Sequence, residues 1–522
     1  MSPKIVVKLS ILAVLLIFSQ TAYALEKQDT EFNDAEVGGE RKTQEQRPNL
    51  LFILTDQQRF DALSIAGNKI LKTRHMDRIG REGVMFRNAY TSAPVCGPAR
   101  TSLLTGLSIE NTGVRFNDGE GKPGIRSYDQ VLVQNEGYIA EYFGKWHAPK
   151  RLANVYRNKL DLDTFNLFGP LRRYLARRGY TGQLQPGQLM DTMSGEGYVP
   201  AVVDSRLNAT DPRELACECD QWGVARLPRR DTLTAFEGRR TIAALKRLNR
   251  SNKPWSLHVS FNSPHGPHTP SEPWASLYDP SKMPVPASIN DQMGDSPYFF
   301  LRRPRYSNPA TVGNMIALYY AQMKELDGWI GRILRTMDRL GITNNTMVVL
   351  TADHGEMLGS HGMIEKDVFY EESVHVPLLI RFPNAMPRQL RVSDPVSHRD
   401  LFATILDYMG AKPQPSDGNS LRAYIERTRR PTFTVAENGQ FDQVMIRAGR
   451  SKLILPNTRD SKGLNTFYDL RRDPHETNNL IFWNNTARAA TLPKANLLKR
   501  LLLQWCVQTN SPHTEEIRNR RL

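Results

Sequence analysis

Four short apolar or β-rich runs in the chain predict strands of one sheet. Residues 48–61 (PNLLFILTDQQRFD) begin with a continuous apolar run, typical of a strand buried on both faces, which stops at Asp56. The other runs lie in residues 138–147, 253–268 and 345–356. Between them, residues 316–342 place apolar side chains three and four positions apart, which predicts a helix that ends at Gly341. This alternation indicates an α/β fold with a large, mostly parallel or mixed sheet flanked by helices.

The pattern changes after residues 409–421 (MGAKPQPSDGNSL), which are rich in Pro, Gly, Asp and Ser. Short β-like pieces follow (TFTVAEN, QVMIRAGRSKLIL and NTFYDL), and then a helical stretch at 487–507. They predict a small antiparallel sheet with one helix. We therefore divide the chain into a catalytic domain, 48–420, and a smaller C-terminal α+β domain, 421–522.

The N-terminus has the pattern of a secretory signal peptide. Residues 1–24 place Lys4 and Lys8 around the start of an apolar run and end in Ala-Tyr-Ala. The run is too short to span a bilayer, although an uncleaved anchor is the alternative. Residues 25–47 are polar and aperiodic, which predicts a disordered leader. We therefore expect a secreted or periplasmic protein without stable membrane insertion.

The net charge of the chain suggests its binding partners, and its few cysteines limit its disulfide bonds. The net charge is +15, and removing the two lysines of the signal peptide leaves +13. Such a chain tends to meet polyanions, although the same charge also serves solubility. No nucleic-acid-binding motif is found, so we expect no nucleic-acid partner. The four cysteines are too few for a disulfide scaffold; Cys217 or Cys219 could pair with Cys506, which leaves Cys96 to be explained.

Ionisable side chains follow the ends of the predicted strands. They are Asp56, Lys145, His147, His265, Asp353 and His354. A single aspartate at a strand end can be a mere helix cap. Ligands of parallel sheets, however, bind outside the carboxyl ends of the strands. Four strand ends that carry such groups to one edge therefore predict an active site.

The run APVCGPARTSLLTG (93–106) predicts an anion site at the start of a helix. Pro98 suits the first helical position, which places Cys96 just before the helix and Arg100 about one turn inside it. Backbone amides, the helix dipole and the guanidinium would stabilise a thiolate or a bound oxyanion there. The simpler alternative is a small buried residue at a helix start. The six fixed positions of Cys-x-Pro-x-Arg-x-x-Leu-x-Thr-Gly favour the functional interpretation.

This run resembles the signature of the type I, formylglycine-dependent sulfatases of the alkaline phosphatase superfamily, with Ala99 in place of the consensus Ser. The resemblance extends over residues 48–480. Its further segments, in family order, are LLFILTDQQRFD, GKWH, SPHGPHTP, TADHGEMLGSHGMIEKDVFYEESVHVPLLIRFP and FYDLRRDPHETNNL. In that family the cysteine is oxidised to formylglycine, whose hydrated aldehyde attacks sulfur. Cys96 would be the precursor, and a formylglycine-generating enzyme would be a partner during maturation.

The resemblance also implies a bound divalent cation. Its ligands would be Asp56, Gln57, the formylglycine made from Cys96, Asp353 and His354. An oxygen-rich carboxylate site suits Ca²⁺. Gln57 and His354 stand where many members have Asp and Asn, and because imidazole favours transition metals, Mg²⁺ or Mn²⁺ stays open.

The resemblance also implies roles for three positively charged side chains. Lys145 and Lys366 would hold sulfate oxygens, and Arg100 would support the formylglycine and the charge beside the metal. This matches the need for fixed positive charge where negative charge develops.

Two histidines are implied to act on protons. His147 would contact the diol and assist its collapse, and His265 would be the general acid beside the leaving oxygen. His268 is a rival for the second role; we favour His265 because it follows the Pro after the strand.

We therefore predict a secreted sulfatase that acts on a sulfated carbohydrate. The Asp-Gln and Asp-His pairs occur in branches that resemble phosphonate monoester hydrolases, which makes a phosphonate or phosphate ester hydrolase the first alternative. An inactive polyanion-binding protein is the second, and the intact motif residues disfavour it. Residues 154–182 would line a sugar cleft or form a surface helix, and Arg115, Asn117 and Asp118 could reach substrate.

Overall fold

The computed structural model describes residues 47–160, 171, 173–175, 177–178, 201–203, 222–225, 227–428, 433–457 and 463–522. The predicted signal peptide, the leader up to residue 46, Cys217, Cys219 and most of the segment 161–182 lie outside these residues. Cys506 is a buried free thiol. In the described part of the chain, no helix combines the length and apolar character that crossing a membrane requires.

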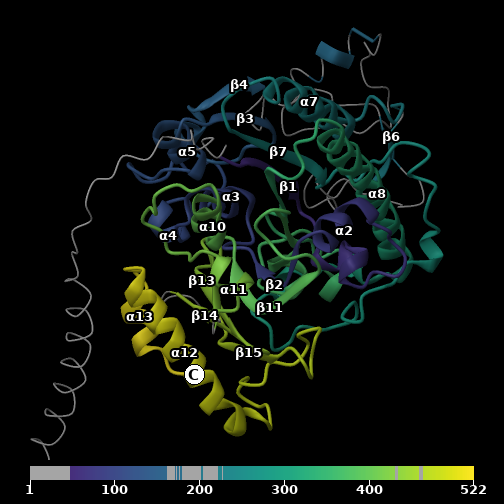
Figure 1. The fold of residues 1–522 in the computed structure, drawn as a ribbon. Helices are drawn as coiled ribbons and strands as arrows, with labels where there is room; N and C mark the ends of the chain where they lie inside the picture. Colours follow the sequence, from purple (N-terminus) through teal and green to yellow (C-terminus); the bar gives the residue numbers. More distant parts are fainter. Residues whose placement is uncertain are drawn as a thin grey trace, which may run out of the picture. The chain divides into compact units, whose positions relative to one another are not determined.

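A mixed sheet of nine strands, counted over the described residues, forms the centre of the fold (Figure 1). Its strands are β1 (Asn49–Asp56), β2 (Val84–Tyr90), β3 (Ile139–Gly144), β4 (Tyr156–Leu160), β7 (Trp255–Pro264), β8 (Thr346–Ala352), β9 (His375–Val376), β10 (Leu378–Arg381) and β11 (Leu390–Ser397). They lie in the order β11-β2-β10-β8-β1-β7-β3-β4, with β9 paired to β2. Strands β8, β1, β7, β3 and β4 run parallel, and β10 is antiparallel to both neighbours. The α/β prediction is confirmed.

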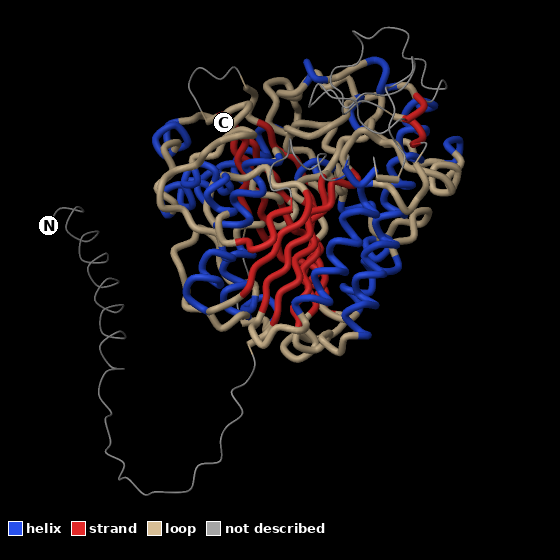
Figure 2. Tube along the Cα trace, turned by 90° about the horizontal axis from the view of Figure 1, so that it is seen from above, coloured by secondary structure: helices blue, strands red, loops and turns tan. Residues whose placement is uncertain are grey.

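Helices cover both faces of this sheet (Figure 2). One face packs on α2 (Arg74–Arg81), α7 (Leu233–Leu248) and α8 (Pro309–Arg339), and the other on α3 (Cys96–Thr105), α5 (Tyr128–Glu136) and α10 (Asp400–Tyr408). In β1, Leu51 and Ile53 face the first core, whereas Leu50, Phe52 and Leu54 face the second. Burial on both faces explains the continuous apolar run in the sequence.

Two helices begin elsewhere than the sequence predicts. Helix α8 begins at Pro309, because the Asn308 side chain accepts the N–H groups of the next turn and proline suits the first position. Helix α3 includes Cys96 as its first residue, so Pro98 is the third residue and not the first. The first bond of α3 runs from Ala99 N to the carbonyl of the residue before Cys96, and the missing N–H of Pro98 therefore costs no helical bond.

The C-terminal part contains the predicted antiparallel sheet and helix. The sheet consists of β12 (Thr434–Asn438), β13 (Gln443–Ala448), β14 (Ser451–Pro456) and β15 (Thr466–Asp469). One face packs on α12 (Arg488–Gln508) through residues such as Val444 and Leu453. The other contributes Met445 and Ile454 to a core shared with Phe369 and Tyr370. This second contact ties the small sheet to the segment that carries Lys366, while the division at residue 420 stays a prediction.

The remaining elements are short. They are α4 (Ile109–Thr112), α9 (Glu371–Val374), α11 (Arg422–Ile425), α13 (Thr514–Asn519), the pair β5 (Ala201–Val203) and β6 (Gly223–Ala225), and 3₁₀ turns such as η9 (Phe299–Leu301).

Candidate active site

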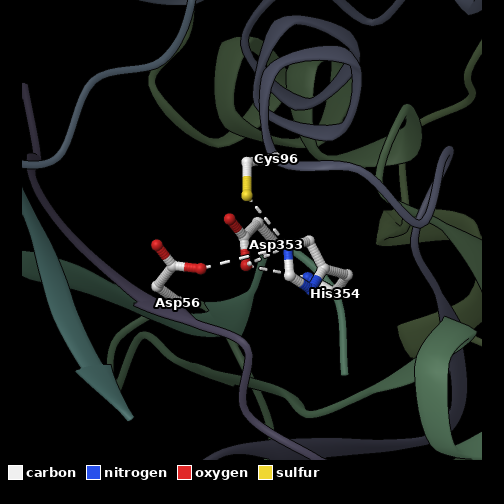
Figure 3. Close-up of side chains that lie close together, drawn as sticks. All are labelled: Asp56, Cys96, Asp353 and His354. Atoms are coloured by element: carbon white, nitrogen blue, oxygen red, sulfur yellow. Dashed lines mark hydrogen bonds and ion pairs between the residues drawn. The ribbon is translucent and has the colours of Figure 1, made fainter. Parts of the chain in front are cut away.

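Neighbouring parallel strands bring predicted site residues to one edge of the sheet. Strand β1 ends at Asp56, β8 is followed directly by Asp353 and His354, β3 by Lys145, and β7 by His265. In the sheet these strands stand side by side in the order β8-β1-β7-β3. Helix α3 begins above the same edge, where its first residue meets the strand-end side chains (Figure 3).

Four buried side chains form a cluster whose donor atoms fit a divalent cation. They are Asp56, Cys96, Asp353 and His354, and one ligand atom of each lies within 4.8 Å of the others. Among the described residues, Asp56 Oδ1 has no hydrogen-bond partner, whereas Oδ2 faces Lys145 and Arg100 in ion pairs. His354 Nδ1 lies 3.0 Å from Gly355 O, and since a carbonyl only accepts, Nδ1 carries a proton. Although burial opposes it, Asp353 and Cys96 raise the pKa of His354 to about 9, so Nε2 also carries a proton and would become a metal ligand by losing it. Carboxylates suit a hard cation, and the imidazole admits transition metals as well.

Gln57 lies beside this cluster, but its amide is engaged by a lysine. Its backbone has φ 68°, and its N–H donates to Asp353 Oδ1 at 3.0 Å. The side-chain Oε1 accepts from Lys366 Nζ at 2.8 Å. The role of Gln57 as a metal ligand stays a prediction.

Positive charge surrounds Cys96. Its Sγ lies 3.1 Å from His354 Nε2 and 3.6 Å from Lys145 Nζ, and Lys145 also forms an ion pair with Asp56. Burial alone would raise the pKa of the Cys96 thiol, but Lys145 and Lys366 outweigh burial and hold that pKa well below its usual value. The start of α3 therefore places Cys96 in an electropositive environment, while its role as an anion site stays a prediction.

Arg100 is buried and holds the carboxylates in place. Its Nε donates to Asp353 Oδ2 at 2.9 Å, and Nη2 lies 3.4 Å from Asp56 Oδ2. Its Nη1 donates to Lys145 O at 2.8 Å and to Ser260 Oγ at 2.7 Å. One guanidinium thereby links helix α3 to the ends of four strands, as its planar fork of donors allows.

The structure brings His265, and not His268, to the second lysine. Lys366 Nζ donates to His265 Nε2 at 3.2 Å and to Glu365 Oε2 at 2.6 Å. Burial, followed by Lys145 and Lys366, lowers the pKa of His265 to about 4. His268 is buried nearby, close enough for Glu365 and Lys366 to influence its pKa, and its Nδ1 contacts Gln322 Oε1 at 2.8 Å.

His147 and Asn117 pack against the first turn of α3. His147 has φ 49°, and its buried Nδ1 has no hydrogen-bond partner within the part of the chain that the structure describes. Asn117 Oδ1 accepts from Gly97 N at 2.8 Å. Of the other residues proposed to reach substrate, Arg115 is paired with Glu110 at 2.6 Å and also with an aspartate of the β12–β13 turn, and Asp118 is exposed. The roles of His147, Arg115, Asn117 and Asp118 remain predictions.

Two glutamates in the site were missed by sequence reasoning. Buried Glu356 accepts from the Gln57 side chain, and its other oxygen accepts from Glu365 N at 2.6 Å. Burial is the main cause that raises the pKa of Glu356 to about 7. Glu365 forms an ion pair with Lys366. In the sequence, only its position next to that lysine could have indicated that it belongs to the site. The pair positions Gln57 and Lys366 relative to each other.

Comparison with known families supports the interpretation of this site. Residues 48–411 match the sulfatase family. Residues 359–502 match the family described as the C-terminal part of N-sulphoglucosamine sulphohydrolase.

Individual proteins are similar over most of the chain. An ulvan-active sulfatase of Formosa agariphila is 28% identical over 454 residues, which cover 85% of this chain and 78% of that protein. The phosphonate monoester hydrolase of Agrobacterium radiobacter has a TM-score of 0.72 at 24% identity, covering 89% of this chain and 96% of the other. BT4656, solved with its substrate D-glucosamine-2-N,6-O-disulfate, has a TM-score of 0.67 at 22% identity, covering 90% of this chain and 99% of the other. At these identities the two structures show a shared fold.

Proposed function

The chain belongs to the sulfatase family of the alkaline phosphatase superfamily and is a sulfuric ester hydrolase, and we propose that it removes sulfate from a sulfated carbohydrate or polysaccharide outside the cytoplasm. The observation that carries the proposal is the buried cluster of Asp56, Cys96, Asp353 and His354, with the Lys145 ammonium against it. The basic charge of the chain and the ulvan-active relative support an anionic glycan as the substrate.

Two groups would complete the site. Asp56, Asp353 and His354, with Gln57 and the modified Cys96, would hold Ca²⁺, or Mg²⁺ or Mn²⁺ in its place; the bound cation would polarise a sulfate oxygen. Conversion of Cys96 by a formylglycine-generating enzyme would supply the hydrated aldehyde as the nucleophile. The electropositive pocket around Cys96 supports such a role, because an attack on sulfur needs an anionic oxygen there.

The lysines and Arg100 supply fixed positive charge. The ammonium groups of Lys145 and Lys366 lie against the Cys96–Gln57 side of the site, where they would hold the sulfate oxygens as negative charge develops on them. Arg100 would keep Asp56 and Asp353 ionised and oriented, since it contacts both carboxylates from below.

His265 would give a proton to the leaving alcohol. Its Nδ1 lies 2.7 Å from Gly266 O, so Nδ1 carries a hydrogen and Nε2 is the atom that faces Lys366. Burial and the two lysines favour the neutral ring, whereas an anionic ester bound beside it would favour the imidazolium that a general acid requires.

Export would bring the enzyme to such a substrate. We infer a cleaved signal peptide at residues 1–24 from the lysines, the short apolar run and Ala-Tyr-Ala. The N-terminal residue of the mature protein, determined after expression in a secreting host, tests this part of the proposal.

Sulfate release from a panel of glycans tests the activity. The panel holds ulvan-, carrageenan-, fucoidan- and glycosaminoglycan-type oligosaccharides, and the enzyme is produced with a formylglycine-generating enzyme, beside Cys96→Ala. Release from one class, absent in Cys96→Ala, supports the proposal. No release from any class by protein with converted Cys96 contradicts it.

A phosphonate or phosphate ester hydrolase is the second candidate. It is favoured by Gln57 and His354 in the metal site and by the fold shared with the phosphonate monoester hydrolase. The ratio of kcat/KM for an aryl sulfate to that for an aryl phosphonate separates the two functions: a ratio above one supports the sulfatase, and a ratio well below one supports the alternative.

A further inference from the structure

Aromatic and basic side chains, of which Phe441 and Arg302 are half-buried and the others exposed, gather on one loop and one hairpin of the described chain. Phe299 and Phe300 are 64% and 50% exposed, and their rings lie 5.9 Å apart. The Phe300 ring also lies 5.8 Å from that of Phe441, in the β12–β13 turn. Arg302 and Arg303 follow on the same loop. We call these five residues the aromatic rim.

The aromatic rim is fixed to both sides of the segment that carries Lys366. Arg303 N donates to Gly362 O at 2.9 Å, four residues before that lysine. On the other side, Asn438 Nδ2 donates to Asp367 O at 2.6 Å, and Asn438 Oδ1 accepts from Phe441 N at 3.3 Å. The rim is therefore joined by hydrogen bonds to the segment that carries the lysine we expect to hold the sulfate.

A buried tyrosine makes this surface rigid. Tyr298 precedes the exposed pair, and its hydroxyl donates to Gln443 Oε1 at 2.7 Å. Its ring packs 5.6 Å from Tyr370 and 6.0 Å from Phe441. A preorganised surface loses little conformational entropy when it binds a ligand.

The charge of the rim is unbalanced. Among the described residues, neither Arg302 nor Arg303 forms an ion pair with a carboxylate, and Arg302 Nε is buried without a hydrogen-bond partner. Arg303 Nη1 donates only to backbone, to Phe300 O at 2.8 Å and to Arg302 O at 3.2 Å. Exposed aromatic faces beside uncompensated guanidinium groups suit a sugar ring that carries sulfate or carboxylate.

We propose that the aromatic rim is a second sugar subsite, which holds an anionic unit of the same chain as the unit whose sulfate is removed. The proposal rests on the proposed function. The exposed Phe300 stacks on the sugar ring, Phe441 supports Phe300 from an edge-on position at 81°, and Arg302 and Arg303 meet the sulfate or uronate group of the sugar. The enzyme therefore prefers oligosaccharides to single sugars and aryl sulfates.

Binding to an inactive variant tests the rim without turnover. Isothermal titration calorimetry on Cys96→Ala uses sulfated tetrasaccharides of ulvan, carrageenan, fucoidan and glycosaminoglycan type. Adding Phe300→Ala should raise Kd about three- to ten-fold for the tetrasaccharide that binds, and Phe300→Tyr in its place should restore the affinity. The matched control is Leu497→Ala, which removes a side chain that is 48% exposed on α12 and should leave Kd unchanged.

Either of two results would refute the proposal that the aromatic rim binds sugar. In the first, no tetrasaccharide binds to Cys96→Ala. In the second, Phe300→Ala leaves every Kd unchanged. Kinetics on the converted enzyme separate this failure from that of the proposed function. There, Phe300→Ala should lower kcat/KM on the tetrasaccharide and leave that on an aryl sulfate within about two-fold. Glycans that bind through the rim but are never desulfated would refute the proposed function and leave the subsite standing.

Discussion

Replacement of Lys452 by methionine tests how the small sheet supports the active-site loop. Lys452, on β14, is fully buried. Its Nζ lies 2.7 Å from Glu371 Oε1, 2.7 Å from Glu476 Oε1 and 2.8 Å from Phe369 O. Glu371 and Phe369 belong to the segment that follows Lys366, so this ammonium joins that segment to the sheet.

The expected loss of folding stability follows from these distances. At an effective dielectric constant of about 20, each pair at 2.7 Å is worth about 6 kcal/mol before the cost of burying the charges is subtracted. Removing one partner of a buried ion pair costs about 3–5 kcal/mol, because the other charge stays buried. Lys452→Met keeps the length of the side chain and removes the cation from buried Glu476, while Glu371 keeps Arg447 at 3.7 Å and the Tyr90 hydroxyl at 2.7 Å. We therefore expect the free energy of unfolding to fall by up to about 3–5 kcal/mol, and the full loss is reached at a pH where Glu476 is ionised in both proteins.

The loss should depend on pH. Burial is the main cause that raises the pKa of Glu476 from 4.5 to about 7, and Lys452 opposes that rise. Without Lys452 the pKa rises further. A carboxyl group whose pKa is higher in the folded state binds its proton more tightly there, so the folded state gains as pH falls. The deficit should therefore grow as pH rises through the pKa of Glu476 and should be larger at pH 8 than at pH 5.

Urea unfolding followed by tryptophan fluorescence measures this deficit at pH 8 and pH 5. Lys412→Met, which removes an exposed lysine, is the control and should change stability by less than about 0.5 kcal/mol. A loss below about 1 kcal/mol for Lys452→Met at pH 8, or a loss that grows at pH 5, would refute the reasoning.

Three further predictions concern the active site. Lys366→Met should lower kcat/KM for a sulfate ester by about 10²–10³-fold, because a positive charge against the sulfate oxygens is lost; steady-state rates equal to those of Lys412→Met would contradict this. Removal of bound metal with a chelator should abolish sulfate release and lower the unfolding temperature, because Asp56 and Asp353 lose their counter-charge. Added Ca²⁺ should restore both the activity and the unfolding temperature. A verified metal-free enzyme that stays active would contradict the proposed metal ligands. Asn117→Ala should lower the free energy of unfolding by about 1 kcal/mol, because Gly97 N loses its hydrogen-bond acceptor at the start of α3. Urea titration measures this loss, and an unchanged unfolding midpoint would mean that this hydrogen bond contributes no stability.

The sheet and much of the site could be predicted because they follow from local patterns. A strand that is buried on both faces needs a continuous apolar run, such as residues 49–56. Parallel strands place the residues that follow their carboxyl ends at one edge of the sheet. Asp56, Asp353 and His354 meet for this reason. The position of His265 directly after the strand also placed it near the site, while its choice over His268 as the general acid stays a prediction.

The remainder depends on contacts between distant segments, which no local pattern encodes. Glu356 and Glu365 enter the site because residues 355–367 fold back on Gln57. The rim forms because Phe300 meets Phe441, 141 residues away in the chain. The start of α3 was placed two residues late because Pro98 is tolerated at any position of the first turn, so its presence does not fix the register.

The central claim is that sulfate ester hydrolysis depends on Cys96 as a modified residue. The most direct measurement compares preparations of the wild-type chain in which the converted fraction of Cys96 differs, as determined by the mass of the peptide that contains it. The account predicts that sulfate release per mole of protein rises in proportion to this fraction and vanishes when it is zero. Equal activity in unconverted and converted preparations would contradict it.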